Sequence, residues 1–506
     1  MSAQPNEGVK QFVEIKNVGK RVHPQYDNKV ELWNFLLSSY RGGMGMQGRA
    51  GMTEAEVKEL KPNGYYAGLF RWPAESAKKY LIRVAMTPYT PYARRIVNTF
   101  VNYLTRETPE RKGDEAYRDL YSDVNMRGMD MTAFVRHCLT MQRVLGEFNV
   151  LIDMPAIKAT PVSRYEEVSR GIRPYAVALM PQNIVDWSVG ANNRYEWVLV
   201  ETSWMVSSVA LEKPYVHTRR TYYDAEVWQV YDKDQRGKWE LIESGQHPCG
   251  EVPVARITTS DFDFNPETPE SWFYDLADMN REIYNLDSID VENFQNQTHG
   301  QLILPADAEM NADAQGRRAS ASEAWTETPE ENGISRYIQT TGIEHTSVKD
   351  KVSDRREEMF RLAGLYHRVQ TRQVETADAK KWDHEEMNQF LAAFAETAEA
   401  TEKEIVRIAG LWRGIKNATV DVTYKKDYSI SDLESMVAAV LDLNTIGFAS
   451  ETGRKEALKR IYVALIGDHV DDATMNKIRN EIDASEQEDP LLALGMMQGA
   501  RDENNE

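Results

Sequence analysis

Two histidine–cysteine pairs are the residues of this sequence whose types best suit metal or nucleophile chemistry. His137 and Cys138 are adjacent on an expected helix, so their side chains point to different faces. His247 and Cys249 flank Pro248 in an expected turn. Neither pair has a second pair of ligands at the spacing of a zinc site. We therefore expect no metal site and no catalytic residue of this kind.

A glycine cluster offers a second chemical possibility. Gly43, Gly45 and Gly48 have the GxGxxG spacing of a dinucleotide-binding loop. Such a loop needs a strand before the glycines and a helix directly after them, but here a helix over 31–40 precedes them. We interpret the cluster as a flexible surface loop. The sequence also lacks a phosphate-binding GxxxxGK[ST] loop, a GxSxG elbow, an HExxH motif and a kinase motif. We therefore expect no enzyme and no cofactor.

The composition is that of an acidic globular protein. The chain has 506 residues, enough for two to four domains, of which 42% are hydrophobic and 27% charged. Its net charge of −19 is unlike that of a tight nucleic-acid binder, so any contact with DNA should be local or non-adhesive. Two cysteines exclude a disulfide framework and fit a reducing compartment. We expect no signal peptide and no membrane partner, because no apolar run approaches ~20 residues.

The elements that organise the chain lie between 268 and 412. An outgoing helix over 268–298 is expected to begin at Thr268, with Pro269 at its first position. A return helix is expected from Ser347 to residue 368, opened by a capping box with Asp350. A third helix, about 50 Å long, should run over 377–412. Its heptad spacing favours a rod that spans a distance or packs against another copy. The apolar residues of this rod are Met387, Leu391, Phe394, Ala398, Thr401, Ile405, Ile408 and Trp412.

The first two of these helices have opposite charge balance. The outgoing helix has seven acids and one base, whereas the return helix has six bases and four acids. The two helices should attract each other, within one chain or between copies. The alternative is two solvated faces whose ion pairs contribute ~0.2–1 kcal/mol each. The residues expected to make inter-helix or inter-subunit contacts are Asp275, Asp278, Glu282, Asp287, Asp290, Lys349, Lys351, Arg355 and Arg356.

Two connections in this region are expected to contact other molecules. The segment 299–345 is too long for a simple turn and has short apolar runs, which predict a small docking β element. Its docking residues are expected to be Gln301, Leu302, Ile303, Leu304, Trp325 and Tyr337. The polar break at 370–376 is either a plain kink or a segment that touches a passing molecule. The residues of this second interpretation are Gln370, Thr371, Arg372, Gln373, Val374, Glu375 and Thr376, followed by Lys380 and Lys381.

The flanking segments predict an α+β fold. Helices over 90–107 and 132–145 precede a strand over 148–153, and the first of them should be capped at Thr90. Residues 175–257 form short runs rich in β-branched and aromatic residues, which predict a mainly antiparallel sheet with a hairpin at 234–237. A strand over 418–424 should rejoin that sheet. Helices are expected over 433–443, 450–466 and 472–482.

Four segments carry a resemblance to a known family. They are WFYDLADMNREIYNLDSIDVENFQNQTHGQLILP, DKVSDRREEMFRLAGLY, VETADAKKWDHEEMNQFLAAF and DYSISDLESMVAAVLDLNTIGFASETGRKEAL. Their order and cadence, over roughly residues 80–480, resemble the portal protein of tailed double-stranded-DNA bacteriophages. The resemblance does not extend to the first 75 residues.

This resemblance implies a homo-oligomeric ring, typically a dodecamer, at one capsid vertex, with a channel for DNA packaging and ejection. Residues 1–267 would be the wing, together with the long helix and strand at 380–430. Residues 268–298 and 346–368 would be the stem, 299–345 the clip, 369–379 the tunnel loop and 431–506 the crown. Arg372 would touch DNA phosphates in the tunnel loop.

The partners implied by the resemblance are double-stranded DNA, the terminase large subunit, a head–tail adaptor, and the major capsid and scaffolding proteins. The implied location is the virion, and the host cytoplasm during assembly. Two other function classes stay open: another head–tail connector or minor head protein, and a cytoplasmic α+β enzyme that uses carboxylates. The mass in solution separates a ring from a monomeric or dimeric enzyme.

Overall fold

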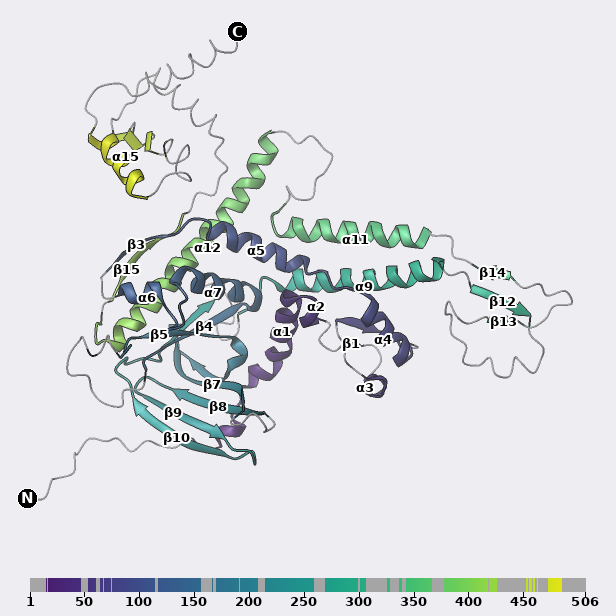
Figure 1. Cartoon of the computed structure of the whole chain (residues 1–506), viewed down its shortest axis with the longest axis horizontal. Coiled ribbons are helices and arrows are strands. Elements are labelled where there is room, and N and C mark those ends of the chain that lie inside the picture. The colour runs from purple at the N-terminus through teal and green to yellow at the C-terminus, as the bar shows by residue number, and fades with distance from the viewer. Residues whose placement is uncertain are drawn as a thin grey trace, which may run out of the picture. The chain divides into compact units, whose positions relative to one another are not determined.

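The computed structural model of the chain has two units, Met1–Asp427 and Tyr428–Glu506 (Figure 1). The residues that it describes are 15, 17–46, 53–60, 64–66, 68–73, 75–113, 117–155, 166, 170–190, 192–207, 214–258, 269–298, 301–305, 325–327, 336–338, 343–365, 377–416, 418–425, 452–453, 455–456, 458–459, 462 and 472–484. Within 295–344 and 377–386 it describes the backbone alone. Helices and sheets both occur, which confirms the α+β class.

The first unit begins with helices and a small hairpin. Its N-terminal elements are η1 (Val18–Lys20), α1 (Pro24–Arg41), α2 (Gly43–Met46), α3 (Glu54–Glu59), β1 (Gly64–Tyr66), β2 (Leu69–Arg71) and α4 (Ala77–Met86). The Thr53 hydroxyl and the Glu56 carboxylate form the capping box that opens α3. Gly43 and Gly45 belong to α2, directly after α1, so no strand precedes them between residues 24 and 46. A dinucleotide loop is therefore excluded at this site.

Three further helices follow along the chain: α5 (Tyr92–Leu104), α6 (Arg118–Ser122) and α7 (Met131–Leu145). The Asp130 side chain accepts a hydrogen bond from the backbone N–H of Ala133 and thereby caps α7. The expected cap of α5 at Thr90 was wrong. Pro91 occupies that position, and its side chain makes no capping bond. A side chain from a distant helix replaces this cap, as described below.

The strands form separate antiparallel sheets. The five-stranded sheet has the order β10-β9-β8-β7-β6, built from β6 (Ile184–Val189), β7 (Tyr195–Val206), β8 (Tyr215–Tyr223), β9 (Val227–Lys233) and β10 (Trp239–Gln246). The three-stranded sheet has the order β11-β4-β5, built from β11 (Val254–Thr258), β4 (Glu147–Asp153) and β5 (Tyr175–Leu179). The expected hairpin at 234–237 joins β9 to β10.

The strand expected over 418–424 is present as β15 (Val420–Thr423), but it does not rejoin either of these sheets. It pairs antiparallel with β3 (Glu110–Gly113), and Val422 lies opposite Arg111. The reason is a buried ion pair. Arg111 donates to both carboxylate oxygens of Glu402 at 2.7 and 2.8 Å, and the Tyr424 hydroxyl donates to Glu402 at 2.7 Å. One buried carboxylate thus holds both strands against the long helix.

A helical hairpin and a long helix complete the first unit. The hairpin consists of α9 (Tyr274–Thr298) and α11 (Ile343–Leu362), which lie side by side (Figure 1). Between them in sequence lies a sheet of β12 (Gln301–Pro305), β13 (Trp325–Glu327) and β14 (Arg336–Ile338). The long helix α12 spans Ala377–Trp412, as the sequence predicted.

The apolar stripe of α12 is buried by its own chain. Leu391, Phe394 and Ala398 are fully buried, and α12 contacts α5, α7, β4, β11 and β15. The indole N–H of Trp412 donates to the backbone carbonyl of Ile152 at 2.9 Å. The expectation that this stripe packs against another copy was therefore wrong for these residues. It forms part of the core of the first unit.

In the second unit the structure describes α15 (Asp472–Ala484), close to the bounds that the sequence predicted. The ammonium group of Lys459 lies 2.7 Å from the Asp483 carboxylate. The helix expected over 433–443 lies outside the described residues, and that expected over 450–466 lies partly outside them. None of the described helices in either unit is long and apolar enough to cross a membrane.

Candidate functional site: the α9–α11 hairpin

The start of the hairpin is set by Ser271. Its hydroxyl donates to the carbonyl of Val144 at 2.7 Å and accepts from the N–H of Phe273 at 3.1 Å. The helix begins at Tyr274, so the start predicted at Thr268 and Pro269 was wrong. The bond from Ser271 to the end of α7 holds the chain in a non-helical conformation before Tyr274. In this conformation the Phe273 ring lies in the core and is fully buried.

The return helix also differs from its predicted bounds. It begins at Ile343, so Ser347 and Asp350 lie inside the helix and form no capping box. It ends at Leu362, six residues early, because Gly364 adopts a φ of 68°. The N–H groups of Gly364 and Leu365 then bond to carbonyls of the last helical turn. Residues 366–368 lie outside the described residues.

Opposite charges of the two helices meet at Glu282. Glu282 of α9 lies 3.2 Å from the Arg355 guanidinium and 3.8 Å from the Lys351 ammonium. Arg355 also bonds to Glu358 on its own helix, and both carboxylates raise the pKa of Arg355, with Glu358 the larger cause. The predicted attraction is thus formed within one chain at Glu282.

A second polar contact lies nearer the end of the hairpin. A carboxylate oxygen of Asp290 lies 2.5 Å from the Nδ1 atom of His345. Asp287, one turn earlier on α9, has a pKa raised to about 6, first by burial and then by the charge of Asp290. The sequence analysis did not single out His345 as the partner of this acidic pair.

The other predicted charges do not cross the hairpin. Asp278 pairs with Arg281 on the same helix, and Arg356 contacts the Ser353 hydroxyl at 3.5 Å on α11. Asp275 and Lys349 are exposed. These groups therefore remain available for contacts outside the hairpin.

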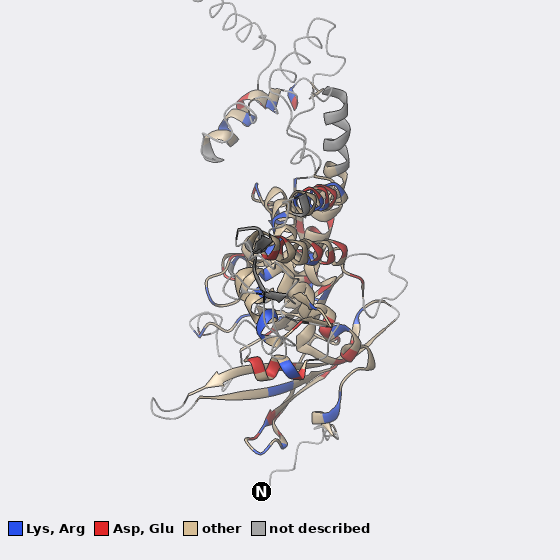
Figure 2. Ribbon diagram, turned by 90° about the vertical axis from the view of Figure 1, so that its right-hand side faces the viewer, with Lys and Arg blue, Asp and Glu red and all other residues tan. Residues whose placement is uncertain are grey.

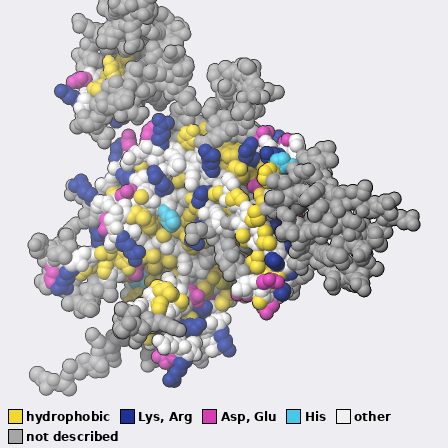
Figure 3. Space-filling model, turned by 45° about the vertical axis from the view of Figure 1, so that its right-hand side comes forward, with side chains coloured by type: hydrophobic (Ala, Val, Ile, Leu, Met, Phe, Trp, Pro, Cys, Tyr) yellow, Lys and Arg dark blue, Asp and Glu magenta, His cyan; other side chains and the backbone are white. Residues whose placement is uncertain are grey.

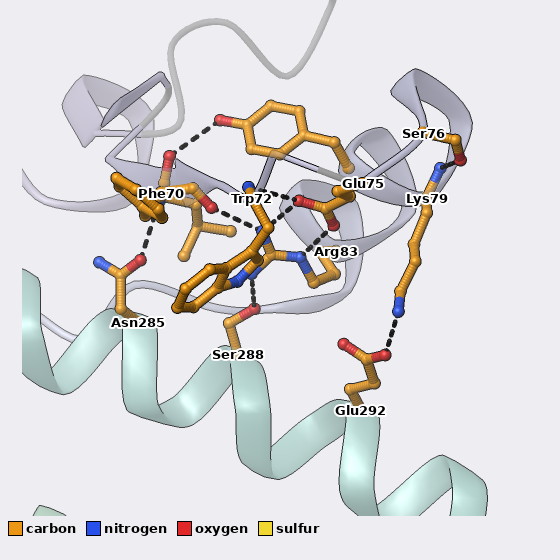
Figure 4. A network of polar contacts seen from close by, with 11 residues as sticks. Phe70, Trp72, Glu75, Ser76, Lys79, Arg83, Asn285, Ser288 and Glu292 are labelled. Carbon is orange, nitrogen blue, oxygen red and sulfur yellow. Dashed lines mark hydrogen bonds and ion pairs between the residues drawn. The ribbon is translucent and has the colours of Figure 1, made fainter. Parts of the chain in front are cut away.

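The opposite side of α9 is held by the N-terminal segment, which the sequence analysis left without a role. Arg83 of α4 forms a buried two-point ion pair with Glu75, with distances of 2.6 and 2.8 Å (Figure 4). Its guanidinium also donates to the Ser288 hydroxyl of α9 at 3.0 Å and to the carbonyl of Phe70 at 2.7 Å. One arginine thereby links α4, β2 and α9.

Amide side chains of α9 complete this attachment. Asn285 accepts from the N–H of Phe70 at 2.8 Å and donates to the carbonyl of Gly68 at 3.2 Å. Lys79 forms an ion pair with Glu292 (Figure 4). The aromatic ring of Tyr284 is buried in the apolar cluster between α9 and this segment.

Asn280 supplies the cap that α5 lacks. It accepts from the N–H of Ala93 at 3.0 Å and donates to the carbonyl of Thr90 at 2.9 Å. A sequence signal for these contacts does exist. Asn280, Asn285 and Ser288 place uncharged polar side chains on an otherwise acidic helix, and such side chains often bond to backbone groups. That signal does not say which backbone they bind.

The hairpin joins the body of the first unit through aromatic rings. Trp272 lies 5.9 Å from Phe100 of α5 and 5.5 Å from Phe390 of α12, between ring centroids. The Arg143 guanidinium stacks on Phe390 and Phe394 at 4.8 and 4.4 Å. Burial lowers the pKa of Arg143 to about 10. This aromatic contact fixes the base of α9 to the long helix.

The predicted docking residues lie in the small sheet that follows α9. Residues 301–304 belong to β12, Trp325 to the parallel neighbour β13 and Tyr337 to the antiparallel neighbour β14. Tyr337 is opposite Leu302 in register. The β element that the length of this connection predicted is therefore present. The structure does not describe the side chains of these residues.

The structure describes few of the predicted tunnel-loop residues. Gln370 to Thr376, with Arg372 among them, fall outside the described residues. Lys380 and Lys381 belong to the first turns of α12, where only the backbone is described. Their contact with DNA stays a prediction.

The histidine and cysteine pairs show no reactive environment. Burial raises the pKa of the Cys138 thiol, and it raises that of Cys249 to about 12. A nucleophilic or metal-binding thiol needs the opposite shift. His247 bonds through Nε2 to the carbonyl of Asp224 at 2.9 Å, and burial lowers its pKa. Among the described residues no three His, Cys, Asp or Glu side chains lie close enough to hold a metal ion.

One comparison with known proteins falls on the same region. A family model described as a domain of unknown function (DUF4055) matches residues 272–413, which run from the base of α9 to the end of α12. No protein of curated function is significantly similar in sequence to this chain.

Three solved structures are among those that match this chain. The neck of an empty gene transfer agent (GTA) particle, computed with C6 symmetry, has a TM-score of 0.39 at 12% identity. The match covers 73% of this chain and 90% of that chain. The neck of a native GTA particle, computed with C12 symmetry, has a TM-score of 0.38 at 11% identity, covering 73% and 89%. A virion of a native gene transfer agent particle has a TM-score of 0.38 at 12% identity, covering 75% and 90%. At these TM-scores the likeness carries no argument about function.

Proposed function

We propose that this chain is a portal subunit: copies of it form a ring at one vertex of a viral capsid, around a channel for double-stranded DNA. In that ring the α9–α11 hairpin is the stem, β12–β14 form the clip, and residues 369–376 form the tunnel loop. Residues 377–379, which the sequence analysis placed at the end of that loop, are the first residues of α12. The protein performs no chemistry. It serves as the platform for a terminase large subunit during packaging and for a head–tail adaptor afterwards.

The observation that carries the proposal is the build of the hairpin. Two helices of 25 and 20 residues lie side by side, and the segment that connects them contains a small sheet. The long helix α12 begins fifteen residues after α11 ends. The hairpin is braced on its second side by Arg83 and Asn285, so it is a rigid element attached to a globular body. A rigid helical pillar with a small sheet in its connection suits a subunit that lines a channel and presents a docking surface.

The charge of the chain supports the same function. Tight DNA binding depends on neutralising phosphates with many cations, and a chain of net charge −19 is poorly suited to it. DNA that must move through a channel requires this lack of adhesion. In the proposal, Arg372, Lys380 and Lys381 make the few local phosphate contacts, next to the narrowest part of the channel.

The mass of the purified protein tests the proposal. The expected particle has about twelve times the mass of the 58.0-kDa chain and shows a central hole in negative-stain images. A monomer or dimer at micromolar concentration and moderate salt would overturn the ring and favour the enzyme interpretation. Duplex DNA is ~20 Å in diameter, as its groove dimensions imply. A ring with a narrower hole would overturn the proposed channel.

The role of Arg372 needs its own experiment. Rings with Arg372→Ala are expected to assemble normally but to retain packaged DNA less well, measured as nuclease-protected DNA per particle. Arg413→Ala, which removes an arginine near the other end of α12, serves as the matched control. Equal retention by the Arg372 variant and the parent would remove this residue from the channel contacts.

A further inference from the structure

The β7–β8 hairpin extends beyond the sheet to which it belongs. The last residue of β7 that pairs with β6 is Val200, and the first residue of β8 that pairs with β9 is Arg219. The four rows from Ser203–Thr218 to Val206–Tyr215 therefore have no third strand beside them among the described residues. Figure 2 shows two strands that extend to the left beyond the rest of their sheet. We call these four rows the arm.

Both faces of the arm carry exposed apolar side chains. Met205 and Val216 are paired on one face and are 63% and 61% exposed. On the other face Trp204 and Tyr215 are 41% and 40% exposed. An isolated two-stranded ribbon in water is marginally stable, and an ordinary one keeps at least one polar face. This arrangement is typical of a segment that becomes covered by a partner.

A second apolar surface lies on the segment that braces α9. Tyr65 and Phe70 are opposite each other on β1 and β2, with ring centroids 5.3 Å apart, and Trp72 lies 5.1 Å from Phe70. The other face of this hairpin is buried through Leu69 and Arg71. Tyr65 and Trp72 are each about half exposed. We call Tyr65, Phe70 and Trp72 the aromatic strip. Figure 3 shows apolar side chains gathered in a column on this side of the surface.

The described cations at both surfaces are paired with carboxylates. At the strip, Arg281 stacks on Tyr65 at 4.2 Å and is paired with Asp278. At the arm, Arg219 lies over Trp204 at 5.3 Å and is paired with Asp232. Neither of these two arginines is therefore free to bind a DNA phosphate. Copies of a chain with net charge −19 repel each other, so they can meet closely only where the surfaces are neutral.

We propose that the arm of one copy docks on the aromatic strip of the next copy, as a head-to-tail contact. This inference rests on the proposed function, because it supplies the contact that closes the ring. Pairing of two different surfaces of one chain generates a ring when the rotation between neighbours closes and an open filament when it does not, whereas a single self-complementary surface ends at a dimer. Each copy then covers both apolar surfaces, and none stays exposed in the closed assembly.

Cysteine cross-linking tests the contact directly. The double variant Met205→Cys with Trp72→Cys carries one thiol on each surface, while Cys138 and Cys249 are buried and do not interfere. Oxidation of the full-length double variant is expected to give a ladder of covalent multimers on a non-reducing gel. Each single variant should give no ladder. Dimers from Met205→Cys alone would show that the arm pairs with itself, which overturns the proposal.

Charge substitution tests the energetic role of the arm. Met205→Glu with Val216→Glu is expected to reduce the fraction of closed rings at least tenfold by mass photometry, with no change in the thermal unfolding midpoint of the subunit. The matched control is Ile242→Glu on β10 of the same sheet, which is 56% exposed and should leave the ring intact. Equal ring fractions in both variants would overturn the contact.

The two proposals fail in different ways. A parent protein that forms rings without a ladder from the double variant overturns the arm contact and leaves the ring standing. A ladder from a protein that never closes into rings supports the contact and overturns the portal function. A monomeric parent without a ladder overturns both.

Discussion

Arg83 and Glu75 form a buried ion pair beside the middle of α9, and neither residue belongs to the hairpin helices. Their side chains are 7% and 3% exposed, and the Arg83 guanidinium also reaches Ser288 of α9 at 3.0 Å. The acidic helix is thus held by an N-terminal segment some 200 residues away in sequence. α9 is thus held on one side by this contact and on another by α11.

Removing one partner of this pair should destabilise the first unit strongly. Glu75→Gln leaves the Arg83 charge buried without compensation, so we expect a loss of about 3–5 kcal/mol in the free energy of unfolding, measured with urea. Glu54→Gln is the control, because the Glu54–Lys58 pair is exposed and should contribute about 0–1 kcal/mol. Similar losses in both variants would contradict the bracing role of Arg83.

The Asp287 carboxyl should make stability depend on pH. Its pKa is about 6 in the folded chain and 3.8 in the reference state, so the folded chain binds this proton more tightly. The group therefore favours folding at low pH and increasingly opposes it as the pH rises from about 3.8 to about 6. In Asp287→Asn this penalty is absent. We expect the difference in melting temperature, variant minus parent, to grow across that window and to level off above it. A difference that stays constant, or shrinks, would show that Asp287 is not the cause.

Exchanging the charges of Glu282 and Arg355 should preserve the attraction between α9 and α11. Glu282→Lys places like charges beside Lys351 and Arg355, so amide exchange in α11 should become roughly two- to fivefold faster. Adding Arg355→Glu restores an opposite pair and should recover much of the protection. Raising the salt concentration should shrink both effects, because the groups are partly exposed. If the double variant exchanges as fast as Glu282→Lys alone, the two side chains do not interact across the hairpin.

The apolar stripe of α12 should stabilise the single chain rather than an assembly. Leu391 is fully buried within the first unit, so Leu391→Ala is expected to lower the free energy of unfolding by about 2–5 kcal/mol, even in protein kept monomeric by dilution. Leu362→Ala at the end of α11 is the control. That side chain is 60% exposed, and its loss should change stability by no more than about 0.5 kcal/mol. A Leu391→Ala effect seen only in assembled protein would place this stripe at an interface.

The sequence by itself predicted the elements whose signals are local. The bounds of α12 follow from an apolar repeat uninterrupted by glycine or proline until Gly410, and the hairpin at 234–237 follows from turn residues between two β-rich runs. The opposite charge of the two hairpin helices predicted their attraction, and Glu282 of α9 lies 3.2 Å from Arg355 of α11 in the structure. The signals for α12 and for the turn act over a few residues and need no distant partner.

Only the tertiary structure decided which distant groups meet. Ser271 delays the start of α9 by bonding to Val144, and β15 pairs with β3 because Glu402 binds Arg111 and Tyr424. The exposed arm and the aromatic strip likewise become visible only when the neighbours of each strand are known. A local pattern states that a side chain is polar or apolar, but the group that covers it comes from elsewhere in the chain. That is the physical reason why the helices of this protein were predictable and their surroundings were not.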